Sequence, residues 1–239
     1  MFSFFSQKSK LLSSIDIHSH LIPAIDDGAR DMDTSIALIK ELKGLGFKKL
    51  VTTPHISDLY PNNSEIILRG FNLLKEEIVR QKIDIELEVA AEYYIDEHFE
   101  ELLVKDDILY FGEERYILIE FSFFTPPHNI ENLIYDIILK GYIPILAHPE
   151  RYRYWHHNFN KYRELKELGL LFQVNLNSIR GDMEIQNVVA KFIKHGLVDF
   201  IGSDTHHMKH IKILKKSLKD SFYKKIFKTN NILNSSISI

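Results

Sequence analysis

Short runs of aliphatic and β-branched residues alternate along the chain with longer segments in which apolar residues recur every three or four positions. The short runs are typical of buried strands and the longer segments of amphipathic helices. Two of the helical segments, residues 34–43 and 185–195, precede glycines that can end a helix, Gly46 and Gly196. The predicted strands are Ile15–His18, Lys49–Thr53, Ile85–Ala91, Tyr116–Phe121, Ile143–Ala147, Leu171–Leu176 and Phe200–Gly202.

This alternation predicts an α/β fold in which repeated strand–helix units build a parallel sheet or barrel. No long linker rich in Pro, Gly or Ser divides the chain, so residues 14–229 are expected to form a single domain. Residues 1–13 are expected to be a flexible N-terminal arm, and residues 230–239 a C-terminal tail of low complexity.

Composition and charge exclude several classes of protein. The 239 residues contain no cysteine, which excludes disulfide frameworks, thiolate metal sites, iron–sulfur clusters and cysteine nucleophiles. Eight lysines and one acid occupy residues 209–239, whereas residues 13–208 hold 20 bases against 32 acids. The excess of acids in residues 13–208 does not suit nucleic-acid binding. The chain lacks a secretory signal and any apolar run near the roughly 18 residues of a membrane helix, so we expect a cytoplasmic protein without a transmembrane segment.

Polar residues of metal-ligand type follow the predicted strands. In a parallel barrel the carboxyl ends of all strands meet on one face, so these distant residues become neighbours. Side chains two positions apart on an extended strand point the same way, so His18 and His20 can reach one metal ion. Glu92 and Glu120 lie inside apolar runs, where an unpaired charge would cost several kcal/mol. The set is His18, His20, His55, Glu92, Glu120, His148, Asn175, Asn177, Asp204 and His206.

Each of these residues also has a structural interpretation, because a lone histidine after a strand is more often a hydrogen-bonded loop residue than a ligand. The coincidence over the whole series of strands favours a metal site. The remaining histidines lack this placement and are expected to lie at the surface or behind the ligands: His98, His128, His156, His157, His195, His207 and His210.

Seven short motifs contain the candidate histidine and carboxylate ligands: Asp16-Ile17-His18-Ser19-His20, Asp26-Asp27-Gly28, Thr53-Pro54-His55, Ala91-Glu92-Tyr93-Tyr94, Ile119-Glu120-Phe121-Ser122, Ala147-His148-Pro149-Glu150-Arg151-Tyr152 and Ser203-Asp204-Thr205-His206. Read in order, these motifs resemble the polymerase and histidinol phosphatase (PHP) superfamily, and within it the bacterial capsule and exopolysaccharide tyrosine-protein phosphatases. The resemblance covers residues 15–206, and a lone His-x-His would be a far weaker sign.

The resemblance implies a distorted seven-stranded (β/α)7 TIM-like barrel that holds two or three metal ions at the carboxyl ends of its strands. It implies that one ion is bound by His18, His20, Glu92 and Asp204, a second by Glu92, Glu120 and His148, and a third by Asp27, His55 and His206. Histidine and carboxylate ligands suit Mn, Fe or Zn, and the resemblance favours Mn. Such a cluster can lower the pKa of a water to near neutrality, so that a metal-bound hydroxide attacks phosphorus.

Arg151 directly follows the ligand segment His148-Pro149-Glu150 and is the expected phosphate-binding group. The candidate catalytic residues are Arg151, Glu92 and Asp204. The alternative is that Arg151 forms an ion pair with Glu150 or another acid of the barrel. Tyr152, Tyr154 and Trp155 could line a site for an aromatic ring or simply pack in the core. The segment after His206 contains no arginine, so a second phosphate-binding arginine of relatives has no counterpart there.

The leading hypothesis is a metal-dependent protein-tyrosine phosphatase, a phosphoric monoester hydrolase, that acts on the tail of a tyrosine autokinase controlling capsule or exopolysaccharide synthesis. The alternatives are a small-molecule phosphatase of the histidinol phosphate kind and an inactive, metal-bearing binding module. Peripheral association with a membrane would come through the substrate, or through the basic helical pattern from Ile211 to Ile226. The oligomeric state and the role of Phe2, Phe4 and Phe5 stay open.

Overall fold

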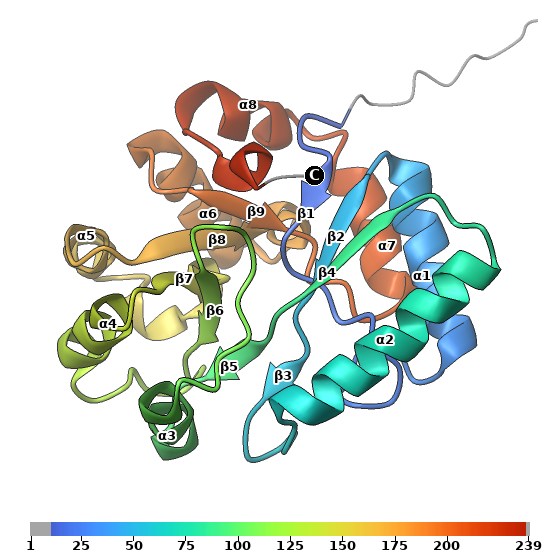
Figure 1. The fold of residues 1–239 in the computed structure, drawn as a ribbon. Helices are drawn as coiled ribbons and strands as arrows, with labels where there is room; N and C mark the ends of the chain where they lie inside the picture. Colours follow the sequence, from blue (N-terminus) through green and yellow to red (C-terminus); the bar gives the residue numbers. More distant parts are fainter. Residues whose placement is uncertain (1–10, 238–239) are drawn as a thin grey trace, which may run out of the picture.

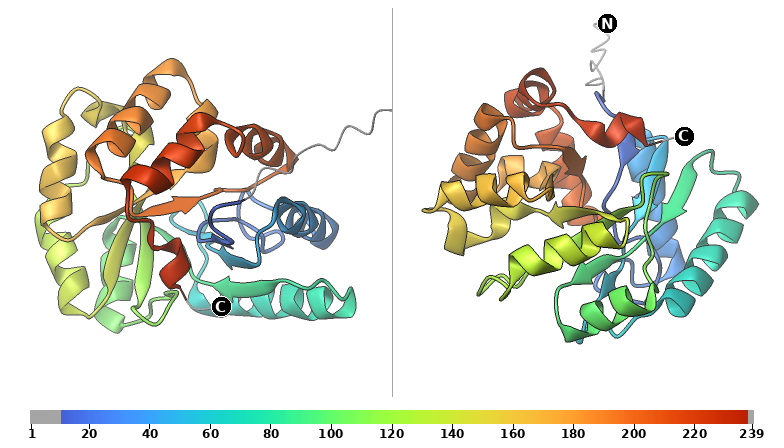
Figure 2. Two further views of the ribbon diagram at one scale, coloured as in Figure 1. Left: turned by 90° about the horizontal axis from the view of Figure 1, so that it is seen from above. Right: turned by 60° about the vertical axis from the view of Figure 1, so that its left-hand side comes forward.

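The structure is a computed structural model that describes residues 11–237. Parallel strands form its centre, and the helices lie around them on the outside (Figure 1; Figure 2). The described helices are α1 (Met32–Leu45), α2 (Ser64–Arg80), α3 (Glu97–Lys105), α4 (Ile130–Leu139), α5 (Phe159–Glu167), α6 (Met183–His195), α7 (Met208–Ser217) and α8 (Ser221–Thr229). The predicted α/β class with parallel strands is confirmed.

The strands form two parallel sheets. One has the order β1 (Ile15–Asp16), β2 (Lys49–Thr52), β4 (Glu86–Val89). The other has the order β3 (His55–Ile56), β5 (Glu92–Tyr94), β6 (Tyr116–Glu120), β7 (Ile143–Ala147), β8 (Leu171–Asn175), β9 (Phe200–Gly202). Every predicted strand run therefore contains a strand of the structure, and two runs continue into a second short strand.

The extra strands β3 and β5 arise where two runs are interrupted and then resume. Pro54 has no N–H group, so it ends the pairing of β2, while its carbonyl still accepts from Glu92 N at 3.0 Å. Beyond the interruption, His55 pairs in register with Glu92. The two sheets thus share the chain segments 49–56 and 86–94 and continue into one another.

Hydrogen bonds also join the last strand to the first. Ser19, just after β1, forms a parallel bridge with Thr205, just after β9, and Asp204 N donates to His18 O at 2.8 Å. Each strand run is therefore hydrogen-bonded to the next, and the last run is bonded to the first. This arrangement brings the carboxyl ends of all runs to one region. The number of strands in a closed barrel stays a prediction.

Helix boundaries follow local capping chemistry. The Asp31 carboxylate accepts from Thr34 N at the start of α1, and Asp182 does the same for Ile185 N at the start of α6. The two predicted glycine stops are confirmed, because Gly46 and Gly196 end these helices in the left-handed region, with φ of 112° and 67°. The apolar pattern after residue 208 forms two helices rather than one, since Asp220 caps a new helix, α8.

The C-terminal segment closes the end of the strand ring opposite the carboxyl ends. Asn234, in the short 3-10 helix Leu233–Ser236, is fully buried. Its Nδ2 donates to Ile15 O at 3.1 Å and to Ile201 O at 2.8 Å, while its Oδ1 accepts from Ile201 N at 2.9 Å. Asn234 therefore connects the C-terminal segment to both β1 and β9 by hydrogen bonds. A small apolar cluster, to which Ile15, Val51 and Phe200 contribute, lies next to this segment.

We expect Asn234→Ala to lower the free energy of unfolding by about 2–4 kcal/mol, because it leaves buried backbone groups of Ile15 and Ile201 without partners. Urea denaturation followed by circular dichroism measures this. Asn231→Ala, at an exposed position in the same segment, is the matched control and should change stability by less than about 0.5 kcal/mol. Equal stability of the two variants would contradict this role of Asn234.

The chain ends pack against the body as far as the structure describes them. Leu12 N donates to Tyr223 Oη of α8 at 2.7 Å, and Ser13 is buried. Residues 1–10 lie outside the described residues, so the role of Phe2, Phe4 and Phe5 is untested. The domain boundaries at residues 13 and 229 stay predictions.

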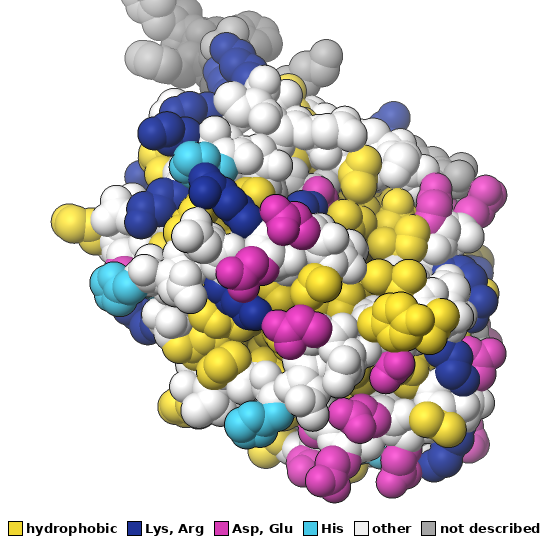
Figure 3. Space-filling view, turned by 90° about the vertical axis from the view of Figure 1, so that its left-hand side faces the viewer, with side chains coloured by type: hydrophobic (Ala, Val, Ile, Leu, Met, Phe, Trp, Pro, Cys, Tyr) yellow, Lys and Arg dark blue, Asp and Glu magenta, His cyan; other side chains and the backbone are white. Residues whose placement is uncertain are grey.

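Surface charge is uneven. Figure 3 shows one face on which Lys and Arg gather mainly at the upper left, whereas Asp and Glu are spread from the centre and upper right to the lower edge. On α8, Lys224, Lys225 and Lys228 are exposed. Within residues 11–237, no helix combines the length and the apolar character needed to cross a bilayer.

Candidate metal centre

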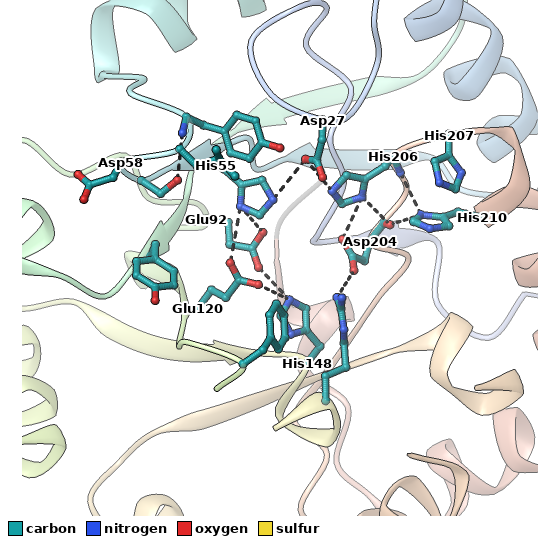
Figure 4. Close-up of a pocket in the computed structure, with 16 residues that line it drawn as sticks. Asp27, His55, Asp58, Glu92, Glu120, His148, Asp204, His206, His207 and His210 are labelled. Atoms are coloured by element: carbon teal, nitrogen blue, oxygen red, sulfur yellow. Dashed lines mark hydrogen bonds and ion pairs between the residues drawn. The ribbon is translucent and has the colours of Figure 1, made fainter. Parts of the chain in front are cut away.

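A pocket of about 670 Å³ lies where the carboxyl ends of the strands meet, and its residues come from segments spread over most of the chain (Figure 4). It is mostly polar on its floor, where histidines and carboxylates point toward one another. The lining residues are Asp27, His55, Ser57, Asp58, Leu59, Tyr60, Glu92, Tyr94, Glu120, Phe123, His148, Arg151, Asp204, His206, His207 and His210.

His18 and His20 lie beneath this pocket, both fully buried. They follow β1 in extended chain, so their rings point to the same side, with the two Nε2 atoms 3.2 Å apart. Glu92 Oε2 lies 3.2 Å from His18 Nε2 and 3.4 Å from His20 Nε2. Asp204 Oδ1 lies 3.5 Å and 3.6 Å from the same two nitrogens. Four ligand-type atoms thus surround one point.

The other nitrogens of these two imidazoles are fixed by residues that the sequence analysis missed. Gln173 Oε1 lies 2.7 Å from His18 Nδ1, and Asp26 Oδ2 lies 2.8 Å from His20 Nδ1. Partners at Nδ1 hold each ring with Nε2 directed at the cluster, as is usual behind metal-binding histidines. Gln173 could have been noticed as a polar residue between Phe172 and Val174 in β8.

Glu92, Glu120 and His148 form a second group. His148 Nε2 lies 3.1 Å from Glu92 Oε1 and 3.4 Å from Glu120 Oε1, and Figure 4 shows the two carboxylates pointing toward this imidazole. The backbone of His148 is left-handed, with φ of 34°, as is that of Asp204, with φ of 50°. Such conformations are costly for residues other than glycine and concentrate at functional sites.

Asp27, His55 and His206 form a third group on the open side of the cluster. Asp27 Oδ1 lies 3.6 Å from His55 Nε2 and 3.4 Å from His206 Nε2. His206 stacks on His20, with ring centroids 3.8 Å apart. His55 Nδ1 also approaches Glu92 Oε2, at 3.2 Å, so His55 connects this group with the first two.

Burial and neighbouring charges shift the pKa values of the two glutamates in opposite directions. Burial alone would raise the pKa of Glu92, but the imidazoles of His18 and His55 and a hydrogen bond from His148 hold that pKa well below its usual range. Burial and the negative charge of Glu92 instead raise the pKa of Glu120 well above its usual range. Burial and the charge of Arg151 lower the pKa of His148 to about 4. The neighbouring acids therefore repel one another strongly.

The donor set fits divalent cations. Glu92 Oε2 is buried and makes no hydrogen bond, although imidazole nitrogens of His18, His20 and His55 lie within 3.2–3.4 Å of it. Histidine nitrogens and carboxylate oxygens at such spacing are typical ligands of transition metals. Three sets of closely spaced ligand atoms occur among the described residues: His20, Asp27, His55 and His206; His18, His20 and Glu92; and His55, Glu92 and Glu120.

Arg151 lies at the edge of the carboxylate cluster and lines the pocket. Its Nη1 donates to Asp204 Oδ2 at 3.1 Å, and its side chain is 39% exposed. The structure thus shows the ion pair with a barrel acid that was one of the two interpretations. The other interpretation, a grip on phosphate, requires the same side chain to face the pocket, and it does.

For two of the three aromatic residues that follow Arg151, the structure bears out the packing interpretation. Tyr152 is fully buried, and its hydroxyl donates to Ala147 O and accepts from Phe121 N, while Trp155 is buried behind it. These two rings therefore pack in the core. Phe123, which the sequence analysis did not select, lines the pocket instead.

Several further polar residues surround the cluster. Asn175 Nδ2 donates to Asp204 Oδ2 at 2.7 Å, and Asn177 Nδ2 donates to Ser203 O, so both asparagines lie behind the ligands. His207 and His210 line the pocket, and His210 Nδ1 lies 2.9 Å from Asp204 O. Of the remaining histidines, His156 is buried, and the exposed ones are His98, His128, His157 and His195.

Comparison with known proteins shows the family of this chain. Residues 14–232 match the capsular polysaccharide synthesis CpsB/CapC family, so the chain belongs to that family. It is 33% identical to the tyrosine-protein phosphatase YwqE of Bacillus subtilis over 198 residues, which cover 82% of this chain and 78% of the relative. It is 30% identical to the tyrosine-protein phosphatase CpsB of Streptococcus pneumoniae over 202 residues, covering 81% and 83% of the two chains.

The fold is similar to a solved structure from work on YwqE of Bacillus subtilis and CpsB of Streptococcus pneumoniae, described as unique metal-dependent tyrosine phosphatases. The TM-score is 0.80, with 30% sequence identity and 90% of each chain covered. The resemblance drawn from the motifs is therefore confirmed at the level of family and fold.

Proposed function

We propose that this protein is a metal-dependent protein-tyrosine phosphatase. The observation that carries the proposal is the set of histidine and carboxylate groups at the floor of one open pocket, with the Arg151 guanidinium beside them. Its family membership and its similarity to tyrosine-protein phosphatases support the same activity.

Three ligand sets would hold the metal ions: His18, His20, Glu92 and Asp204; Glu92, Glu120 and His148; and Asp27, His55 and His206. Glu92 contributes to two sets, in keeping with the approach of its two oxygens to different imidazoles. We propose manganese as the resident metal, with iron and zinc as the alternatives that the same donors accept. Bound divalent cations would supply Lewis acidity toward phosphoryl oxygens and lower the pKa of a coordinated water.

The residues of the chain bind and orient the substrate. Arg151 would hold two phosphoryl oxygens through its planar guanidinium, and its hydrogen bond to Asp204, which keeps it beside the carboxylate cluster, supports this role. Gln173 and Asp26 keep the rings of His18 and His20 in one orientation. A phenolate leaving group has a pKa near about 10, so an aryl ester needs less help from a general acid than an alkyl ester does.

The proposed substrate is a phosphotyrosine in the tail of a tyrosine autokinase that controls capsule or exopolysaccharide synthesis. The family description, which concerns capsular polysaccharide synthesis, supports this choice. The proposed location is the cytoplasm, where kinases that use ATP form phosphotyrosine, and the proposal involves neither nucleic acid nor a transmembrane segment.

Comparative turnover tests the proposal. Metal-loaded protein should hydrolyse a phosphotyrosine peptide and para-nitrophenyl phosphate, and should be at least about tenfold slower, in kcat/KM, on histidinol phosphate. A preference for histidinol phosphate would instead indicate a small-molecule phosphatase. Metal binding without any turnover would indicate a binding module.

The role of Arg151 is tested by kinetics. If its guanidinium holds phosphate, Arg151→Ala should raise KM and lower kcat/KM by roughly 10-fold to 1000-fold, which corresponds to one charge-assisted bidentate contact. Arg151→Lys should recover only part of this loss, because a point charge cannot reproduce the planar fork. Steady-state kinetics on a phosphotyrosine peptide, with metal content measured in parallel, gives the answer.

Arg153→Ala is the matched control, since Arg153 pairs with Asp182 and Glu184 at the surface and does not line the pocket. It should leave KM unchanged. An unchanged KM in Arg151→Ala, together with lower thermal stability, would show that Arg151 serves only its ion pair with Asp204.

A further inference from the structure

Phe123 places an apolar ring in the wall of the pocket, next to the polar side chains of His148 and Arg151. Its side chain is 39% exposed and lines the pocket beside the metal-ligand residues. A large exposed apolar ring at the wall of a polar site loses the benefit of burial unless something covers it. The question is therefore what covers Phe123.

The ring of Phe123 contacts two residues at the floor of the site. Its centroid lies 5.7 Å from that of His148, with 27° between the planes, and the Arg151 guanidinium carbon lies 4.7 Å from it. Since Arg151 is the proposed grip on phosphate, Phe123 lies within reach of the group esterified to that phosphate. In a tyrosine phosphate this group is the phenyl ring, joined to phosphorus through the phenolic oxygen.

The loop that carries Phe123 is held in place. Ser122 Oγ accepts from the backbone N of Phe124 and of Thr125, at 3.2 Å and 3.4 Å, and Ser122 O accepts from the Tyr154 hydroxyl at 3.0 Å. Phe123 also packs on the buried ring of Tyr152, at 5.7 Å. The ring is thus positioned before a ligand arrives, so little ordering entropy is lost when a ligand packs against it.

We propose that Phe123 forms the subsite for the aryl ring of the substrate and so sets the preference of the site for aryl over alkyl phosphates. The ring of a bound phosphotyrosine packs against the exposed part of Phe123 while its phosphate reaches Arg151. This inference rests on the proposed phosphatase function and names the feature of the substrate that the chain recognises. Phe123 acts in binding and takes no part in bond making or breaking.

The neighbouring Phe124 provides a matched control. It belongs to the same loop, is 90% exposed, and does not line the pocket. Both substitutions to alanine remove the same side chain, so a difference between them reports the position of the ring rather than the loss of apolar surface. Phe123→Tyr keeps a ring and serves as the conservative variant.

Two phosphonates that differ only in the ring test the proposal without requiring turnover. Calorimetry on metal-loaded protein gives the Kd of phenylphosphonate and of methylphosphonate. The wild type should prefer phenylphosphonate, and Phe123→Ala should reduce that preference by about 3-fold to 10-fold, the worth of one aromatic contact. Methylphosphonate should bind Phe123→Ala within about twofold of wild type. Phe124→Ala should change neither Kd, and Phe123→Tyr should keep the preference.

Two results would overturn the proposal. An equal loss of affinity for both phosphonates in Phe123→Ala would show that the ring only supports Arg151 or His148. An unchanged preference would show that the aryl ring lies elsewhere. Failure of the proposed phosphatase function is a separate observation, namely no hydrolysis of para-nitrophenyl phosphate by the metal-loaded wild type.

Discussion

Chelation of divalent cations is expected to abolish phosphatase activity, with a loss of at least about 1000-fold in kcat/KM. The physical reason is that the chain has no cysteine nucleophile and that the histidines and carboxylates converging at the pocket floor would be occupied as metal ligands, so hydrolysis would depend on the Lewis acidity that the bound cations supply. The measurement is hydrolysis of para-nitrophenyl phosphate before chelation, after removal of the chelator, and after addition of Mn, Fe or Zn. Elemental analysis of protein purified without chelator should find at least two transition-metal ions per chain.

Iodoacetamide is the control for this experiment. It alkylates thiols, and a chain without cysteine should keep its full rate. Phosphate and vanadate, in contrast, should inhibit because they occupy the phosphoryl position. Full turnover by metal-free protein would refute the proposed mechanism.

Glu92→Gln is expected to lower kcat/KM by at least about 100-fold while the fold stays intact. Glu92 approaches imidazoles on both sides, with Oε2 at 3.2 Å from His18 and Oε1 at 3.1 Å from His148. An amide has about the same size, but it carries no charge and offers one acceptor oxygen instead of two. Two ligand sets would therefore be weakened at once, so metal content should fall together with activity.

Glu97→Gln is the matched control, because Glu97 lies exposed in the first turn of α3 and outside the pocket. It should keep metal content and keep its rate within about twofold. Circular dichroism and thermal unfolding of the metal-free proteins establish that both variants fold. A folded Glu92→Gln variant with near wild-type rate and metal content would remove Glu92 from the site.

The groups behind the ligands show where sequence reasoning stopped. Nothing in the sequence around Asp26 indicates that its carboxylate orients His20, yet Asp26 Oδ2 lies 2.8 Å from His20 Nδ1. Gln173 is separated from His18 by 155 positions. Such pairs depend on which strands become neighbours and in what register, and neither follows from the spacing of residues within one strand.

The aromatic residues show the same limit. Tyr152, Trp155 and Phe123 are all close in sequence to ligand motifs, and no local pattern distinguishes them. The path of the chain after β7 buries Tyr152 and Trp155, whereas the loop after β6 leaves Phe123 in the pocket wall. Whether an aromatic side chain in a loop is buried in the core or faces the pocket is decided by packing against other elements.

The sequence by itself determined the order and kind of the elements, because strand and helix periodicity and the helix stops at Gly46 and Gly196 are local properties of the chain. It also determined that a ligand-type residue follows each run, and a parallel arrangement requires such residues to converge. The tertiary structure decided which imidazole approaches which carboxylate, the left-handed backbone of His148 and Asp204, and the closing contacts of Asn234. These features depend on sheet register and on the junction of the last strand with the first, where residues nearly 190 positions apart meet, as Ser203 N and Asp16 Oδ1 do across 187 positions. Distances of that kind are set only when the whole chain has folded.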